Sequence, residues 1–304
     1  MNGGPRLSIV IAAGHAGSNL APILLAVTRP TSGQGLSPLP VPVEVIVVAA
    51  GPLDCDAARS AAAAFPDVRV LEARPGALIP EMWRDGLCAA RGEFVATLTA
   101  HCIPDPSWLQ CAAGLCFAPQ EAAVGGYFAN ADGADARAWA IYLLRYAEFT
   151  RPLDRASVTH VAADNAVYRR ASILACVDLL PQGFWEPRYH RRFLDSGQRM
   201  RLEAGLRVVH SNRYGGREFA AQRRAHGRRF GYDRAASLGG GWRVVYALAL
   251  PVVPALLFAK VVLRSLRSGA LGTAPPATLP WLAFFVVHWS AGEVLGFLRG
   301  LRRT

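Results

Sequence analysis

Short runs of apolar, β-branched residues alternate with helix-like segments over roughly the first hundred residues of the chain. Four of these runs predict buried strands: LSIVIAA (7–13), VEVIVVAAG (43–51), VRVLEA (68–73) and FVATLT (94–99). Ser18 or Asn19 offers a cap for a helix after the first strand, and Asp54 or Asp56 offers one after the second. Strands that alternate with helices in this way predict a mostly parallel, doubly wound α/β sheet flanked by helices.

Beyond Pro106 the alternation gives way to a mixed pattern. The spacing of apolar residues predicts helices over 107–118, 136–149 and 184–197, and strands over 122–130 and 206–210. The segment HVAADNAVYRR carries a strand into a loop, and a helix is expected to start near Arg170. This part of the chain therefore extends the α/β domain without repeating its first half.

Two apolar stretches near the C-terminus, 244–263 and 279–298, each have about the 20 residues that cross a bilayer core. They predict a membrane-associated helical hairpin over 236–304, after an α/β domain over 1–235. Lys260 in the first stretch and Glu293 in the second are costly at bilayer depth unless they face protein. Amphipathic helices that lie in the membrane interface are therefore the alternative.

The charge and the cysteine content of the chain narrow the kinds of molecule and compartment that we expect for it. The chain carries a formal charge of +11, and 13 arginines fall between Arg188 and Arg234, directly before the apolar stretches. Such a charge suits phosphate groups or an anionic membrane surface, and we expect this segment and the chain terminus on the cytoplasmic side. Nucleic acid is a poor partner because no aromatic residue is interleaved with the arginines of QRRAHGRRF (222–230), a segment that leads into the apolar stretches. Six cysteines without a CxxC pair indicate a reducing compartment, and the first apolar run is too short for a signal peptide.

The strand FVATLT ends in Thr99, Ala100, His101 and Cys102. In open α/β sheets ligands bind at the carboxyl ends of strands, so chemistry is expected at this tip. A loop with Pro104, Asp105 and Pro106 follows.

The order of LSIVIAAGHAGSNL, VEVIVVAAG, ARGEFVATL, PDPSWL and NAVYRR resembles the nucleotide-binding half of family 2 glycosyltransferases. The spacing from Gly197 to His210 fits the same family, and the likeness covers about residues 6–230. No single motif is specific, and the order and spacing carry the resemblance. It implies a GT-A fold, a nucleotide-sugar donor, and a divalent metal (Mn²⁺ or Mg²⁺) that bridges the donor diphosphate.

The chain departs from that family at two acidic positions. Ala49, Ala50 and Gly51 stand where the family has acids that bind the nucleoside, and Asp54 is the nearest substitute. Thr99, Ala100 and His101 stand where it has the metal-binding Asp-x-Asp motif. His101 is either a metal ligand, with His210 as a second, or a loop histidine bonded to backbone.

The resemblance places the catalytic base at Glu186, which would deprotonate the acceptor hydroxyl. The alternative for Glu186 is a helix N-terminal glutamate that the helix dipole favours. The remaining predicted site residues are Asp54, His101 and Arg84 for the donor, and Asn165, Arg169 and Trp185 for the acceptor.

We therefore predict an inverting, membrane-associated glycosyltransferase of the cell inner membrane, with its catalytic domain cytoplasmic. It would act on a lipid-linked or saccharide acceptor, for example in cell-envelope polysaccharide synthesis. The alternative is a catalytically inactive GT-A-like protein that binds a ligand or partner. A soluble oxidoreductase is disfavoured because no G-x-G-x-x-G follows the first strand.

Overall fold

The structure is a computed structural model that describes residues 4–14, 20–29, 31–32, 35–36, 41–151, 154–211 and 214–301. The chain packs as two compact units. The sheet unit comprises Met1–Ala129 and Arg151–Ser211, and the helical unit comprises Asn130–Thr150 and Asn212–Thr304. The sequence predicts a domain boundary at residue 235, between two parts that differ in function as well as in packing. That boundary stays a prediction.

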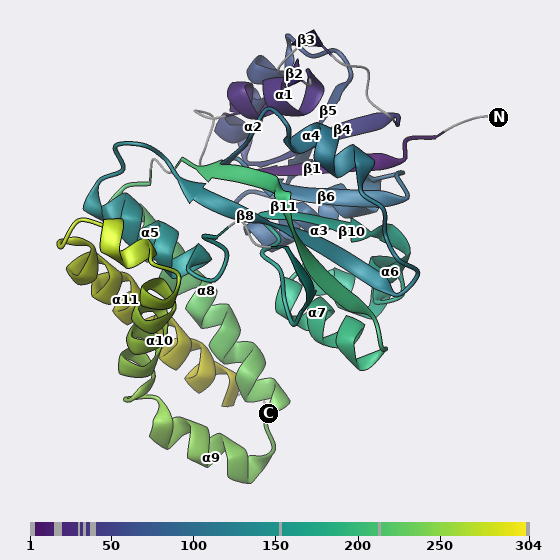
Figure 1. Ribbon diagram of the computed structural model, residues 1–304. Coiled ribbons are helices and arrows are strands. Elements are labelled where there is room, and N and C mark those ends of the chain that lie inside the picture. Colours follow the sequence, from purple (N-terminus) through teal and green to yellow (C-terminus); the bar gives the residue numbers. More distant parts are fainter. Residues whose placement is uncertain are drawn as a thin grey trace. The chain divides into compact units, whose positions relative to one another are not determined.

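The first half of the sheet unit is parallel. Its strands are β1 (Leu7–Ala13), β4 (Val43–Ala50), β5 (Val68–Ala73) and β6 (Phe94–Thr99), in the spatial order β5-β4-β1-β6. The helices between them are α1 (Leu20–Thr28), α2 (Pro52–Ala62) and α3 (Ile79–Ala89), and β2 (Thr31–Ser32) pairs with β3 (Gly35–Leu36). All residues of β1 and β6 are buried, because helices cover both faces of the sheet (Figure 1). The parallel, doubly wound arrangement predicted for this segment is confirmed.

The second half makes the sheet mixed. The described residues form a nine-stranded sheet, in which β10 runs antiparallel to β6 and β8, and β11 runs antiparallel to β7 and β9. These strands are β7 (Cys102–Pro104), β8 (Glu121–Asn130), β9 (Arg155–Val158), β10 (Asn165–Arg169) and β11 (Arg199–His210). Their helices are α4 (Trp108–Gly114), α6 (Arg170–Leu174), the 3₁₀ turn η1 (Val177–Gln182) and α7 (Glu186–Asp195).

Three local predictions need adjustment. The strand predicted over 206–210 is the end of the much longer β11, whose first half alternates charged and apolar residues. The cap of α2 is Gly51, without a side-chain hydrogen bond, so Asp54 and Asp56 do not cap it. Ser18 and Asn19, the predicted caps of α1, lie outside the described residues.

The helical unit contains α5 (Ala136–Tyr146), α8 (Gly216–Ser237), α9 (Gly240–Ala249), α10 (Val253–Arg267), the 3₁₀ turn η2 (Ala270–Thr273) and α11 (Thr278–Leu301). Its core joins α5, α8 and α11 through buried residues such as Ile141, Phe219 and Phe285. By length and composition α11 alone among the described helices is able to cross a membrane, and α9 with α10 form a further candidate bent by 71°. The straight span predicted over 244–263 is thus broken near Pro251.

Helices α8 and α11 run in the same direction in close contact. Gly216 lies against Trp281, Gly227 against Trp289, and Gly231 against Glu293. A Cβ atom at Gly227 would lie 2.0 Å from the carbonyl oxygen of Trp289. Glycine on α8 is therefore what permits this close approach.

Candidate functional site

The carboxyl ends of β1 and β6 form the topological switch point of the sheet. Strand β1 pairs with β4 on one side and with β6 on the other. After β1 the chain continues toward β4, and after β6 it continues toward the second half of the sheet, so the two connections diverge at this point. Crevices at such points are where open α/β sheets bind ligands. Thr99, the last residue of β6, and His101 lie at this point.

A carboxylate that the sequence analysis did not single out lies at the same place. Because β10 is antiparallel to β6, with Asn165 opposite Leu98, the residue before β10 meets the tip of β6. That residue is Asp164, which is buried and accepts a hydrogen bond from Thr99 Oγ1 at 3.0 Å. Thr97 Oγ1 fixes the same turn by donating to the carbonyl of Ala163 at 2.6 Å. An acidic side chain therefore lies beside the tip of β6, although the sequence at the tip itself contains no acid.

Glu186 is held toward the same edge of the sheet. It is the first residue of α7, half-buried, and it follows Trp185. The backbone N–H of Phe184 donates to the carbonyl of Pro80 at 2.7 Å. Pro80 belongs to the first turn of α3, which enters from the carboxyl end of β5, so the loop before Glu186 is held at the ligand-binding edge.

Tyr168 is a buried phenol on β10, opposite Val95 of β6. Burial raises the pKa of Tyr168 well above its ordinary value, and the negative charges of Glu186 and then Asp164 raise this pKa further. Both acids therefore act electrostatically on one hydroxyl group, which also lies 3.1 Å from Nε2 of His190.

The aromatic layer beneath these groups is fixed. The ring of Phe184 packs on Tyr168 and Tyr189, with centroids 5.1 Å and 4.5 Å apart. Trp83 of α3 contacts Phe184 edge to face and donates its indole N–H to the carbonyl of Leu98 at 2.9 Å. The position of α7, and hence of Glu186, is thereby tied to β6.

Histidines 101 and 210 lie on neighbouring segments. The carbonyl of His101 accepts a hydrogen bond from the backbone N–H of Ser211 at 2.8 Å, and His210 pairs with Cys102 across β11 and β7. His101 is 3% exposed and His210 is fully buried. Among the described residues, no group of three or more His, Cys, Asp or Glu side chains is arranged to hold a metal ion. The assignment of His101 and His210 as metal ligands stays a prediction.

Two predicted donor residues occupy different surroundings. Arg84 on α3 is paired with Asp85, at 2.7 Å, and reaches the carbonyl of Pro181 in the segment that leads to Glu186. Asp54 lies in the first turn of α2, directly after the carboxyl end of β4. Both residues lie on helices that begin at the ligand-binding edge of the sheet. Arg84 lies on the same side of this edge as Glu186.

Two predicted acceptor residues are held by the fold instead. The Asn165 amide donates to the carbonyls of Leu206 and Tyr127 and accepts from Trp108 Nε1, all while fully buried. Arg169 pairs with Phe94 at the opposite edge of the sheet, where it stacks on Phe94 and Phe117. The third, Trp185, is half-buried beside Glu186, and its indole N–H donates to the carbonyl of Gln182 at 2.8 Å. Of the three, Trp185 alone lies beside the predicted base.

The fold is a mixed α/β fold with a central sheet flanked by helices. It resembles a mannosyltransferase, PcManGT from Pyrobaculum calidifontis, whose structure was solved in complex with GDP-Man and Mn²⁺. The likeness has a TM-score of 0.54 and 14% sequence identity, and it covers 95% of this chain and 87% of that chain.

No family model matches the sequence. No curated protein matches it either. At 14% identity the structural likeness shows the fold, and the resemblance to family 2 and the degenerate Asp-x-Asp motif remain predictions.

Proposed function

We propose that this chain is an inverting glycosyltransferase that moves a sugar from a nucleoside-diphosphate donor to an acceptor hydroxyl at the cytoplasmic face of a membrane. The observation that carries the proposal is the position of Glu186 at the start of α7, where the Phe184–Pro80 hydrogen bond holds its loop to α3, on the same edge of the sheet as Asp164 at the tip of β6. The glycosyltransferase-like fold supports it. A family 2 assignment belongs to the same proposal.

Glu186 is the base in this mechanism. Its carboxylate takes the proton of the acceptor hydroxyl while the acceptor oxygen bonds to the anomeric carbon. The bond from that carbon to the donor diphosphate breaks in the same step, which inverts the configuration. Glu186 suits this role because it is half-exposed on a helix that is fixed by Phe184.

The leaving diphosphate needs positive charge or hydrogen-bond donors. The structure offers Arg84, next to the loop before Glu186, and the segment of His101 at the tip of β6. The carboxylate of Asp164 at the same tip carries the same sign of charge as a diphosphate, so we assign it to a sugar hydroxyl of the donor.

One observation favours the second candidate, a GT-A-like protein that binds a ligand without turnover. Strand β4 ends with Ala49 and Ala50, and Gly51 follows, so no acid stands at this end of the strand. Nucleotide-sugar binding alone would be expected from such a protein.

Calorimetric titration tests the proposal. The full chain is titrated with GDP-mannose, UDP-glucose and their parent diphosphates, with and without Mn²⁺, and each donor that binds is then assayed for turnover. We expect saturable binding of at least one donor, which the Glu186→Gln variant retains while losing turnover. Absence of binding to every donor would contradict the enzyme and the inactive binding protein alike.

A further inference from the structure

The helical unit exposes an unusual number of large apolar side chains. On α11 these are Phe284, Val287, Leu295 and Leu298, which are 39 to 55% exposed. Their spacing of three, eight and three residues keeps them on one side of the helix, away from the glycines that contact α8. An exposed apolar stripe of this length marks a surface that meets another apolar phase.

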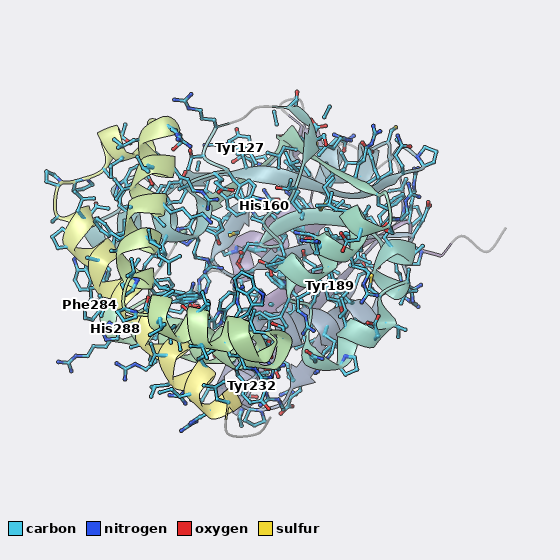
Figure 2. All side chains as sticks on the ribbon, turned by 90° about the horizontal axis from the view of Figure 1, so that it is seen from below. Tyr127, His160, Tyr189, Tyr232, Phe284 and His288 are labelled. Atoms are coloured by element: carbon cyan, nitrogen blue, oxygen red, sulfur yellow. The ribbon has the colours of Figure 1, made fainter. Side chains whose placement is uncertain are left out.

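Three arginines follow the stripe along the neighbouring helix. Arg217, Arg224 and Arg228 are exposed on one side of α8, seven and four residues apart. Together with Phe284 and His288 they line an open groove of about 380 Å³ between α8 and α11. Phe284 and His288 lie next to each other on α11, at the rim of the helical unit (Figure 2).

The charge of this groove is uncompensated. Among the described residues no carboxylate forms an ion pair with Arg217, Arg224 or Arg228, whereas the neighbouring Arg229 is paired with Asp233 at 3.1 Å. Three unpaired guanidinium groups beside an exposed apolar stripe match a surface that presents phosphate groups above hydrocarbon.

The packing of α8 on α11 argues against a simple membrane span. The two helices run in parallel over their lengths, with Gly227 beside Trp289 and Gly231 beside Glu293. If α11 crossed the hydrocarbon core, the arginines of α8 would cross with it, which bilayers strongly disfavour. Glu293 itself is 1% exposed and bonds Tyr246 of α9, so this acid faces protein and not lipid.

We propose that the helical unit docks in the interface of an anionic phospholipid bilayer. Arg217, Arg224 and Arg228 bind headgroup phosphates in the groove, and the α11 stripe enters the outer hydrocarbon without crossing it. The inference deepens the membrane part of the proposed function and rests on it. Vesicle binding requires neither donor nor turnover, so its failure and the failure of the transferase proposal are separately visible.

Flotation of the full chain with vesicles tests the proposal. The vesicles contain phosphatidylcholine alone or with phosphatidylglycerol, and flotation is repeated at high salt and after alkaline carbonate extraction. We expect binding to the anionic vesicles only, weakened by salt and abolished by carbonate. Replacement of all three arginines by glutamine should weaken binding on the order of 100-fold, since each contributes about fivefold near an anionic surface.

Two controls keep the result specific. The variant Arg188→Gln, Arg191→Gln, Arg192→Gln removes the same charge from α7 and should bind anionic vesicles nearly as the parent does. Val287→Ser with Leu298→Ser tests the apolar stripe and should weaken binding with the arginines in place. Circular dichroism of each variant shows whether its helices are intact.

Three outcomes overturn the proposal. Equal binding to neutral vesicles that resists carbonate means that α11 spans the bilayer. An effect of the α7 control as large as that of the α8 variant means that net charge alone drives binding. Inorganic phosphate that binds the chain while vesicles do not means that the groove takes a free anion.

Discussion

At the scale of single residues, the acid at the sheet edge comes from a segment that is distant in sequence. Asp164 takes a place at the tip of β6 because β10 is antiparallel to that strand, and nothing in the local pattern of HVAADNAVYRR gives that direction. Asn165 and Arg169 were predicted from the same segment, but their polar groups are used within the fold. Strand direction decides which of the polar residues in this segment reaches the ligand edge.

Replacement of Asp164 by asparagine tests its place in the site. Asparagine keeps the oxygen that accepts from Thr99, so the thermal unfolding midpoint should change by no more than a few degrees. The loss of charge should lower kcat/KM for the donor by about 10- to 100-fold, because a charged acceptor bond contributes about 1.5–3 kcal/mol. Asp195→Asn, at the exposed far end of α7, serves as the control. An Asp164→Asn enzyme with the kcat/KM of the parent would remove Asp164 from the site.

His190 makes the stability of the sheet unit depend on pH. Burial, together with the smaller effect of the charge of His160, lowers the pKa of His190 to about 3. In the unfolded chain His190 binds a proton near pH 6.5, whereas in the folded chain it is neutral at that pH. The stability from neutral His190 is therefore complete above pH 6.5 and is lost as the pH falls toward 3, by about 1.4 kcal/mol per pH unit.

Urea unfolding of the parent and of His190→Gln at several pH values checks this expectation. The difference between their unfolding free energies should shrink as the pH falls from 6.5 to 5. A difference that stays constant over that range would show that folding does not lower the pKa of His190.

At the scale of elements, hydropathy located the C-terminal helices but not their partners. The stretch 279–298 falls within α11, whereas 244–263 divides into α9 and α10 with a bend of 71°. The parallel partner of α11 is the arginine-rich α8, which a hydropathy profile assigns to water. Only the spacing of Gly227 and Gly231 on α8 and of Gly292 and Gly296 on α11 marks this packing in the sequence.

Substitution of Gly227 tests the helix pair. In Gly227→Leu the side chain would overlap the carbonyl of Trp289, so the helical unit should lose about 1–3 kcal/mol or more of stability. Gly239→Ala is the matched control, because nothing lies within 4 Å of a Cβ atom there and its φ of −69° suits alanine. Limited proteolysis between α8 and α11, together with thermal unfolding, measures both. Equal stability of the two variants would mean that α8 and α11 do not pack as described.

At the scale of the whole molecule, the parallel half of the sheet was predictable and the rest only in part. Strands buried on both faces give continuous apolar runs, so 7–13 and 94–99 coincide with β1 and β6. The run 68–73 coincides with β5, an edge strand in which Ala73 alone is buried. The full length of β11 was not predicted, because charged and apolar residues alternate along its first half. Similarly, residues 130–150 belong to the helical unit although they lie between two segments of the sheet unit, a fact of packing that local pattern does not contain.

The central claim is sugar transfer with Glu186 as the base. Its most direct measurement follows label from a radioactive nucleotide sugar into acceptor, using the full chain on anionic vesicles and the donor that binds most tightly. The account predicts transfer by the parent chain, retained by Asp195→Asn, and a drop of about 10²–10⁴-fold in Glu186→Gln with donor binding unchanged. Equal transfer by the parent and Glu186→Gln would contradict the account.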